Sequence, residues 1–282
     1  MEKQEIMELV DQAMEGDKEA LEAVLVDIQD LVYNLSLRML GMPADAEDAS
    51  QEILIKVMTR LSSFRKESSF TTWVFRIAVN HLRDYKKTMF AKHPLSFEFY
   101  GADIMSGREK DVPDLTQGVE VSLLAEELKF SCTNVMLQCL DAESRCIFIL
   151  GTMFKVDSAV AGEILGITPE AYRKRLSRIR QKMADFLGTY CGLSGTGPCN
   201  CEKRVNYAIA SHRIDPQHLE YQGRSTSSAG MLERCKGAME KIDDLSAIFS
   251  QMPSYKVSPK VMQFLEQFLN SEEYRIVKEA KQ

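Results

Sequence analysis

The sequence predicts an all-α protein, with two small helical domains joined by a flexible linker and a helical extension at the C-terminal end. Three observations predict this architecture. Apolar residues recur at spacings of three and four, rather than two, along most of the chain. The 282 residues are 45% hydrophobic and 27% charged, which is ordinary for two or three small globular domains. Helix-start residues, such as Thr168 with Pro169, precede the periodic segments.

Composition also limits the class of protein. No apolar run reaches the roughly 18 to 20 residues of a membrane span, and the N-terminal segment MEKQEIMELV lacks a signal-peptide pattern. Seven cysteines in a chain of this length do not form the dense framework of a secreted disulfide protein. We therefore expect a cytoplasmic protein without a membrane partner.

Charge is distributed unevenly along a chain whose net charge is −6. Residues 1–52 carry fourteen acidic and three basic side chains, whereas residues 56–92 carry nine basic and two acidic ones. A second basic run, RKRLSRIRQK, lies at 173–182. This asymmetry is typical of separate surfaces for partners of opposite charge, although solvated helices of mixed sign also show it.

Residues 169–187 predict a helix with one apolar and one basic face. The core stripe consists of Tyr172, Leu176, Ile179 and Met183. The opposite face carries Glu170, Arg173, Lys174, Ser177, Arg178 and Gln181. The apolar segment 158–167 predicts a short preceding helix, which Gly166 ends with a positive φ angle. Such a pair is typical of a helix-turn-helix, whose second helix enters the DNA major groove. A solvated basic face on a bundle helix is the alternative.

An acidic ridge precedes a basic helix in the N-terminal third of the chain. In ADAEDASQEILIKVM, residues 44–58, the acids Asp45, Asp48 and Glu52 recur on one side of a predicted helix. The next helix is expected to have Thr71 or Thr72 as its N-cap. Its outer face is expected to carry Trp73, Arg76, Asn80, Arg83 and Lys87. Rings and cations in this pattern are typical of single-strand binding, although a Trp near a helix start more often packs.

These segments together resemble bacterial RNA polymerase sigma factors of the extracytoplasmic-function (ECF) branch. DAEDASQEILIKVM and LSSFRKESSFTTWVFRIAVNHLRDYKK resemble region 2, and residues 141–187 resemble region 4. The resemblance implies a non-enzymatic subunit that binds core RNA polymerase and directs promoter-specific transcription initiation. KVDSAVAGEILGI departs from the family pattern, because its acidic residue is displaced, and this leaves the capping of the first motif helix open. A free-standing helix-turn-helix regulator that does not bind core polymerase is the alternative function.

The resemblance also implies which residues make each contact. The expected partners are promoter DNA and the β′ clamp helices and β flap of core polymerase. The polymerase-binding residues are expected to be Asp45, Asp48, Gln51 and Glu52. Those expected at the −10 element are Phe64, Arg65, Lys66, Trp73, Arg76, Asn80, Arg83 and Lys87. Those expected at the −35 element are Glu170, Arg173, Lys174, Ser177 and Arg178.

The predicted division places a region 2 domain at 1–90, a flexible linker at 91–119, a region 4 domain at 120–188 and a cysteine-containing extension at 189–282. Apolar stripes predict two extension helices, at about 229–252 and 259–270, whose faces must be buried somewhere. Extensions regulate some family members in place of a separate anti-sigma factor. The resemblance therefore implies either intramolecular regulation or an anti-sigma partner.

The extension cysteines suggest a soft-metal site. Cys191, Cys199 and Cys201 surround a Gly-Pro turn, and zinc prefers four ligands. The candidates for the fourth ligand are His212, His218 and Cys235. A redox switch and inert reduced thiols are the alternatives, and no other cofactor is expected. The remaining cysteines, Cys132, Cys139 and Cys146, are predicted to be small core residues.

Overall fold

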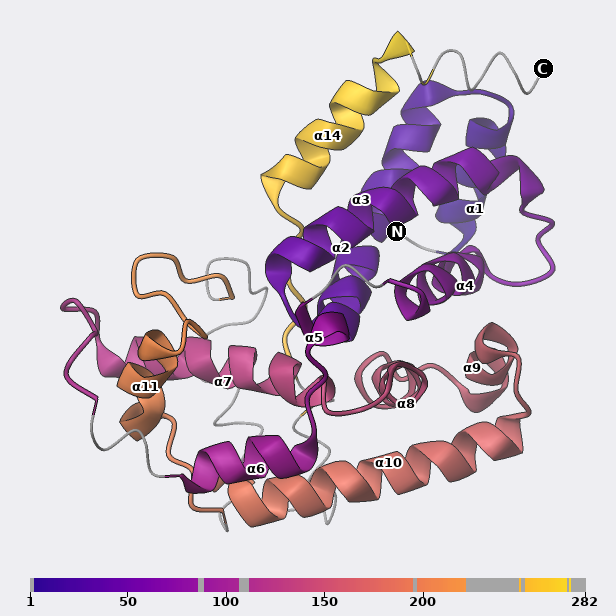
Figure 1. Cartoon of the computed structure of the whole chain (residues 1–282). Helices are drawn as coiled ribbons and strands as arrows, with labels where there is room; N and C mark the ends of the chain where they lie inside the picture. The colour runs from indigo at the N-terminus through magenta and orange to yellow at the C-terminus, as the bar shows by residue number, and fades with distance from the viewer. Residues whose placement is uncertain are drawn as a thin grey trace. The chain divides into compact units, whose positions relative to one another are not determined.

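The computed structural model describes residues 3–85, 89–106, 112–194, 197–221, 249, 252–272 and 274. The described part is all-α, as predicted (Figure 1). It contains no β-strand, and its two isolated bridges join Cys191 to Cys199 and Asp215 to His218. Within these ranges, no helix combines the length and the apolar character that a membrane span requires.

The chain folds as two compact units. Unit 1 consists of Met1–Leu37, Met42–Tyr85 and Tyr255–Gln282, and unit 2 of Arg38–Gly41 and Lys86–Ser254. This grouping differs from the predicted division, because the expected linker belongs to unit 2 and the extension contributes to both units.

Unit 1 is a helical bundle in which α3 packs against α4 and α14. Its helices are α1 (Lys3–Met14), α2 (Lys18–Leu40), α3 (Pro43–Arg60), α4 (Phe70–Arg83) and α14 (Pro259–Leu269), with a 3-10 turn at Leu61–Ser63. The fully buried residues of its core include Val24, Val32, Ile53, Val57, Val74 and Val79. Burial of these branched side chains is the main source of the bundle's stability.

The predicted extension helix at 259–270 is confirmed as α14, whereas the predicted helix at 229–252 lies mostly outside the described residues. The segment before α14 is held on α2. The Asn34 side-chain amide donates to the Tyr255 carbonyl at 2.7 Å, and its oxygen accepts from the Tyr255 N–H at 2.8 Å. Asp30 accepts from the N–H of Val257 at 2.9 Å. Part of the extension is therefore built into unit 1.

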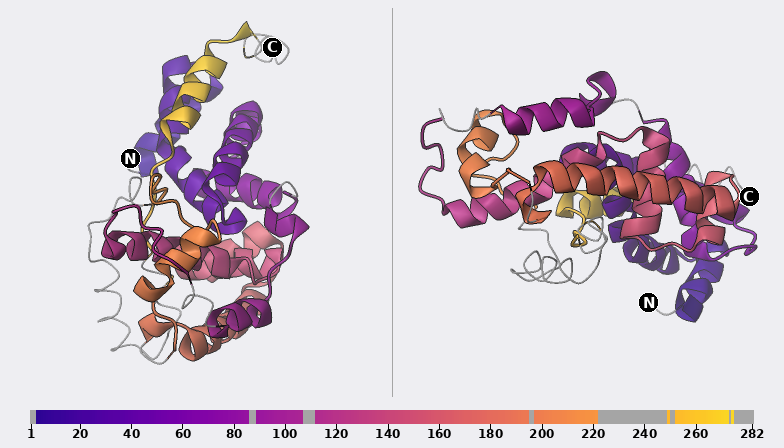
Figure 2. Two further views of the ribbon diagram at one scale, coloured as in Figure 1. Left: turned by 60° about the vertical axis from the view of Figure 1, so that its left-hand side comes forward. Right: turned by 90° about the horizontal axis from the view of Figure 1, so that it is seen from below.

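Unit 2 is organised around α10, the long helix seen in Figures 1 and 2, which packs against α6, α8 and α9. The helices of this unit are α5 (Met89–Lys92), α6 (Phe97–Met105), α7 (Val121–Leu137), α8 (Ala142–Phe148), α9 (Ser158–Leu165), α10 (Pro169–Tyr190) and α11 (Val205–Ala210). Single turns lie at Ile149–Met153 (π-helical), Gly192–Ser194 and Glu202–Arg204 (both 3-10).

The expected flexible linker contains α6, which packs on the C-terminal half of α10. The rings of Phe97 and Tyr100 lie 5.1 and 5.8 Å from the ring of Phe186, measured between centroids. Gly101 lets the helix approach closely, because a Cβ there would stand 2.5 Å from a ring carbon of Tyr190. The linker was expected to be flexible, but the aromatic residues of α6 pack it on α10.

Candidate nucleic-acid interface

The predicted acidic ridge lies on the solvent side of α3. Asp48 is exposed, and Asp45, Gln51 and Glu52 are partly exposed. Glu52 lies within 3.2 Å of the Nε2 of His81 on α4, so it also ties the two helices together. No cation among the described residues forms an ion pair with Asp48, which leaves this carboxylate open to a partner.

Three aromatic rings cluster where α4 begins. Phe64 lies 5.5 Å from Phe70 and 5.4 Å from Trp73, measured between ring centroids. Phe70 and Trp73 stack at 5.8 Å. Phe64 is only 3% exposed, so its ring packs inside the unit and offers little surface to a base. Trp73 is half-buried, which fits the packing interpretation of that residue.

Helix α4 begins at Phe70, earlier than the expected cap at Thr71 or Thr72. Ser69 is the actual N-cap, and its hydroxyl accepts from the Thr72 N–H at 3.1 Å. The Thr72 hydroxyl lies 2.8 Å from the same oxygen and is buried. Because Ser68, Ser69, Thr71 and Thr72 all carry hydroxyl groups on either side of Phe70, the sequence alone could not decide which one caps the helix.

The basic residues expected at the −10 element lie in the loop before α4 and along α4. In the loop, Arg65 and Lys66 are exposed. Lys66 has a φ angle of 59° and forms an ion pair with Asp11 at 2.5 Å. Along α4, Asn80 is exposed and Arg76 and Arg83 are partly exposed. The last predicted member of the row, Lys87, lies outside the described residues.

The first helix of the predicted helix-turn-helix, α9, has a well-defined start. Asp157 is its N-cap, and its carboxylate accepts from the Ala159 N–H at 2.7 Å. This answers the question that the displaced acid had left open. Gly162 is required by the turn, because a Cβ there would stand 2.6 Å from the carbonyl oxygen of Ile167.

The turn and the second helix follow the prediction. Gly166 has a φ angle of 70° at the end of α9. Thr168 caps α10 and accepts from the Ala171 N–H at 3.2 Å. The helix runs to Tyr190, three residues beyond the predicted end at 187.

Helix α10 is fixed against α8 by close packing and hydrogen bonds. The Tyr172 hydroxyl donates to the Ile147 carbonyl at 3.1 Å, and burial raises the pKa of Tyr172, so it stays a donor. A Cβ at Gly151 would lie 2.6 Å from that hydroxyl. Arg180 turns inward and donates to the Gly151 carbonyl at 3.1 Å. The helix is therefore positioned rigidly and presents its other face to solvent.

All five residues expected at the −35 element are exposed on α10: Glu170, Arg173, Lys174, Ser177 and Arg178. Glu170 and Lys174 pair at 2.8 Å, but at about 70% exposure this pair adds little stability and can open for a ligand. Arg175 of the same basic run pairs with Glu143 instead. The structure thus separates cations that face solvent from those that hold the domain together.

The extension cysteines meet around a small cavity of about 30 Å³, lined mainly by apolar side chains. Cys191, Cys199 and Cys201 line it together with Cys132 of α7. The prediction that Cys132 is simply a core residue missed this proximity, because a contact between distant segments leaves no local pattern. In the described part of the chain, no group of three or more Cys, His, Asp or Glu side chains is arranged to hold a metal ion. Cys235 lies outside that part, and the zinc hypothesis stays a prediction.

The buried Cys139 and the partly buried Cys191 are expected to react slowly. Burial raises the pKa of Cys191 to about 11 and that of Cys139 to about 12. At pH 8 the thiolate fraction of Cys191 would be about 200-fold below that of a free cysteine with a pKa near 8.5. We expect peptide-resolved alkylation of the native chain to be slower by about that factor at Cys191 than in urea. Equal rates would contradict burial and favour the redox alternative.

Known proteins similar to this chain identify its family. The Sigma-70 region 2 family model matches residues 25–88. The ECF RNA polymerase sigma factor SigW of Bacillus subtilis is 30% identical over 181 residues, which span 63% of this chain and 94% of SigW. The chain belongs to the ECF family of RNA polymerase sigma factors. It is therefore a transcription initiation factor that acts with core RNA polymerase at promoters, and it is not an enzyme.

Other relatives extend the comparison. The RNA polymerase sigma factor NccH of Alcaligenes xylosoxydans is 29% identical over 64% of this chain and 92% of NccH. The ECF sigma-E factor of Escherichia coli K12 is 39% identical over 77 residues, which are 27% of this chain and 40% of that factor. The solved structure of CnrH in complex with the cytosolic domain of CnrY covers 64% of this chain and 94% of CnrH, with 22% identity and a TM-score of 0.46. The predicted membership of the ECF family is confirmed.

Proposed function

We propose that this sigma factor docks core polymerase through the α3 ridge and holds promoter DNA on two separate faces. The α3 ridge consists of Asp45, Asp48, Gln51 and Glu52. The loop before α4 and the outer side of α4 would hold the opened −10 strand, and α10 would read the −35 duplex. The observation that carries this proposal is the outer face of α10. Every contact residue expected there is exposed, while hydrogen bonds on the opposite face hold the helix in place.

The two DNA faces suit different forms of DNA. An α-helix fits the major groove of duplex DNA, where side chains near its N-terminus reach base edges. Arg173 and Lys174 lie in the second turn of α10, and Arg178 lies further along where phosphates pass. Helix α4 carries cations and the Asn80 amide as well as the half-buried Trp73, a combination that can track a single strand.

Arg173→Ala is expected to weaken binding to −35 duplex DNA by about 5- to 150-fold, because a base-edge contact of this kind is worth about 1–3 kcal/mol. The measurement is a titration of the full chain against duplexes selected by the wild-type protein. Arg175→Ala is the matched control on the same helix, since that side chain pairs with Glu143 of α8. An unchanged sequence preference of the Arg173 variant would remove this residue from the contact set.

We also propose that the C-terminal extension modulates this function from within the chain. Supporting this, segment 199–221 packs in unit 2 and segment 255–272 packs in unit 1, so neither is a detached tail. The regulatory role is tested by loosening the packing of segment 199–221 and measuring promoter binding in the presence of core polymerase.

A further inference from the structure

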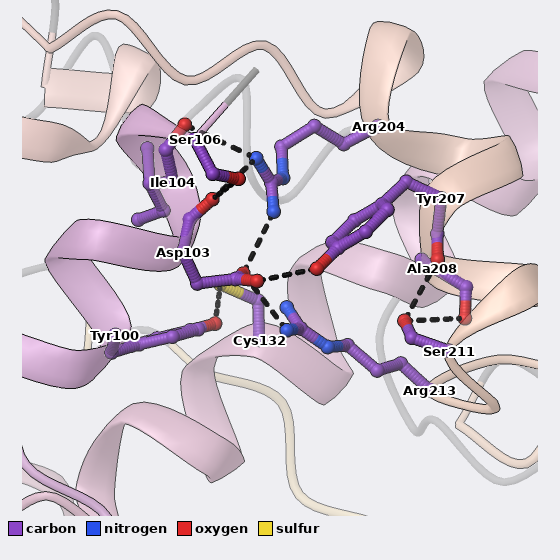
Figure 3. Close-up of polar contacts among 10 residues, drawn as sticks. All are labelled: Tyr100, Asp103, Ile104, Ser106, Cys132, Arg204, Tyr207, Ala208, Ser211 and Arg213. Atoms are coloured by element: carbon purple, nitrogen blue, oxygen red, sulfur yellow. Dashed lines mark hydrogen bonds and ion pairs between the residues drawn. The ribbon is translucent and has the colours of Figure 1, made fainter. Parts of the chain in front are cut away.

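Asp103, near the end of α6, is the centre of a polar cluster formed with the extension (Figure 3). Arg204 donates to its carboxylate at 2.8 Å, and Arg213 donates to the same oxygen at 2.9 Å. The Tyr207 hydroxyl donates to the other carboxylate oxygen. Arg204 also reaches the carbonyl of Ile104 at 3.3 Å. Three side chains from the extension therefore converge on one linker carboxylate.

This cluster is largely removed from solvent. The side chains of Asp103 and Arg204 are 8% and 6% exposed, and that of Arg213 is 25% exposed. Burial tends to raise the pKa of Asp103, but the Tyr207 hydrogen bond and the charge and hydrogen bond of Arg213 outweigh it and lower the pKa. The carboxylate is therefore ionised near neutral pH, where the charged contacts persist.

A second carboxylate anchors the same stretch of extension on α7. Glu127 is 2% exposed and accepts from the backbone N–H groups of Glu220 and Tyr221, at 2.6 and 3.0 Å. Between the two anchors, a shared apolar core forms from Leu124, Ala125, Leu128, Val205, Ala208 and Ile214. The segment from 199 to 221 is thus held on α6 by charge and on α7 by both charge and apolar packing.

Helix α6 needs contacts with other segments to be ordered. A helix of nine residues is too short to be stable in isolation. One side of it packs on α10, and Asp103 joins it to the extension. Loss of the Asp103 contacts would leave α6 supported by its packing on α10. Buried ion pairs add little net stability but fix one arrangement, and removing one partner leaves the others buried and uncompensated.

We propose that segment 199–221 is an intramolecular latch that closes on the linker through Asp103 and limits how far the two DNA-binding units can separate. Released, residues 97–120 would add up to roughly 80 Å of tether at full extension. A bivalent ligand gains affinity only when the tether spans both sites. The inference rests on the proposed promoter contacts for its consequence, but the latch itself is observable without DNA.

The first test is hydrogen exchange of the full-length chain, followed peptide by peptide. Asp103→Asn and Arg213→Met are each expected to speed exchange in both 97–106 and 199–221 by at least about 10-fold, because local opening becomes easier. The double variant should be no faster than the faster single variant, since both changes break the same contact. Asp185→Asn, an exposed residue on α10, is the matched control and should change neither peptide.

Tyr207→Phe distinguishes loss of the cluster from a general folding defect, because it removes one hydrogen bond without removing a charge. It is expected to give an intermediate increase in the same two peptides, with the rest of unit 2 unchanged. Unchanged exchange in 97–106 for all of these variants would overturn the latch, as would a purely additive effect of the double variant.

The second test concerns DNA in the presence of core polymerase. On a promoter fragment carrying both elements, Asp103→Asn is expected to raise holoenzyme affinity at least about 3-fold, while affinity for an isolated −35 duplex stays unchanged. If the variant and wild-type holoenzymes bound the fragment with both elements equally well, the tether role would be overturned. If the wild-type holoenzyme bound neither fragment, the proposed promoter contacts would fail, and the exchange result would still decide whether the latch exists.

Discussion

Asp48→Lys is expected to lower the affinity for core RNA polymerase by at least about 30-fold. Promoter-specific transcription is expected to be abolished as a result. Asp48 is the exposed member of the α3 ridge, whereas the other three are partly exposed. Replacing it with a cation puts like charges together wherever a basic partner surface meets the ridge. Disruption of a charged interface contact costs about 2–5 kcal/mol, which is the origin of the 30-fold lower bound.

Asp48 tests the ridge more cleanly than Glu52. Glu52 lies 3.2 Å from His81, so its replacement would also disturb the contact between α3 and α4. Exposed substitutions away from such contacts usually change stability by less than about 0.5 kcal/mol. The thermal midpoint of Asp48→Lys should therefore match that of the wild type.

The measurement is a fluorescence titration of the labelled full chain with core polymerase, followed by run-off transcription. Glu22→Lys, an exposed charge reversal on α2, is the matched control because it changes net charge equally. If Asp48→Lys and Glu22→Lys bind polymerase alike, net charge or another surface accounts for docking, and the ridge assignment is wrong.

Local patterns in the sequence predicted the helix-turn-helix well. The positive φ angle of Gly166 and the cap at Thr168 follow from the conformational preferences of those residue types over one or two positions. The exposed face of α10 follows from a 3.6-residue period. These features depend on nearest neighbours along the chain, which a single sequence contains in full.

Contacts between distant segments were not predictable in the same way. Asp103 meets Arg204 and Arg213 across about a hundred residues, and no local pattern pairs them. Similarly, Cys132 was assigned to packing because its position on a helix gave no hint of the extension cysteines beside it. The linker was expected to be flexible, although the rings of Phe97 and Tyr100 pack part of it on α10.

Exposure also altered the interpretation of single residues within the predicted −10 set. Phe64 was expected at the −10 element, yet its ring is 3% exposed and lies against Phe70 and Trp73. Sequence composition shows that a ring is present but not which way it turns. We therefore expect Arg65 and Lys66, which are exposed, to account for more of the loop's DNA contact than Phe64 does.

Arg145→Met is expected to destabilise unit 2 by about 3 kcal/mol. Arg145 lies on α8 and reaches back to carbonyls at and just beyond the end of α7, of which that of Leu137 also accepts from the Leu140 N–H at 3.1 Å. Its guanidinium donates to the carbonyls of Leu137, Gln138 and Leu140 at 3.0, 3.3 and 2.8 Å. Each buried acceptor left without a donor costs about 1–3 kcal/mol, although partial hydration of the site would reduce the sum.

Charge adds to the geometric argument for Arg145. Burial lowers the pKa of Arg145 to about 10, so the side chain is still protonated at neutral pH. A cation at a helix C-terminus is favoured by the helix dipole, and methionine removes that term while keeping most of the side-chain volume. Cavity formation therefore contributes little, and the loss is mainly that of the donors and the charge.

The measurement is thermal unfolding of the full chain followed by circular dichroism. For a domain of this size, about 3 kcal/mol corresponds to a fall of roughly 6–12 °C in the midpoint. Arg178→Met, the same change at an exposed position on α10, should shift the midpoint by no more than a degree or two. Similar shifts for the two variants would mean that the carbonyls at the end of α7 find other donors, and that Arg145 does not hold the α7–α8 turn.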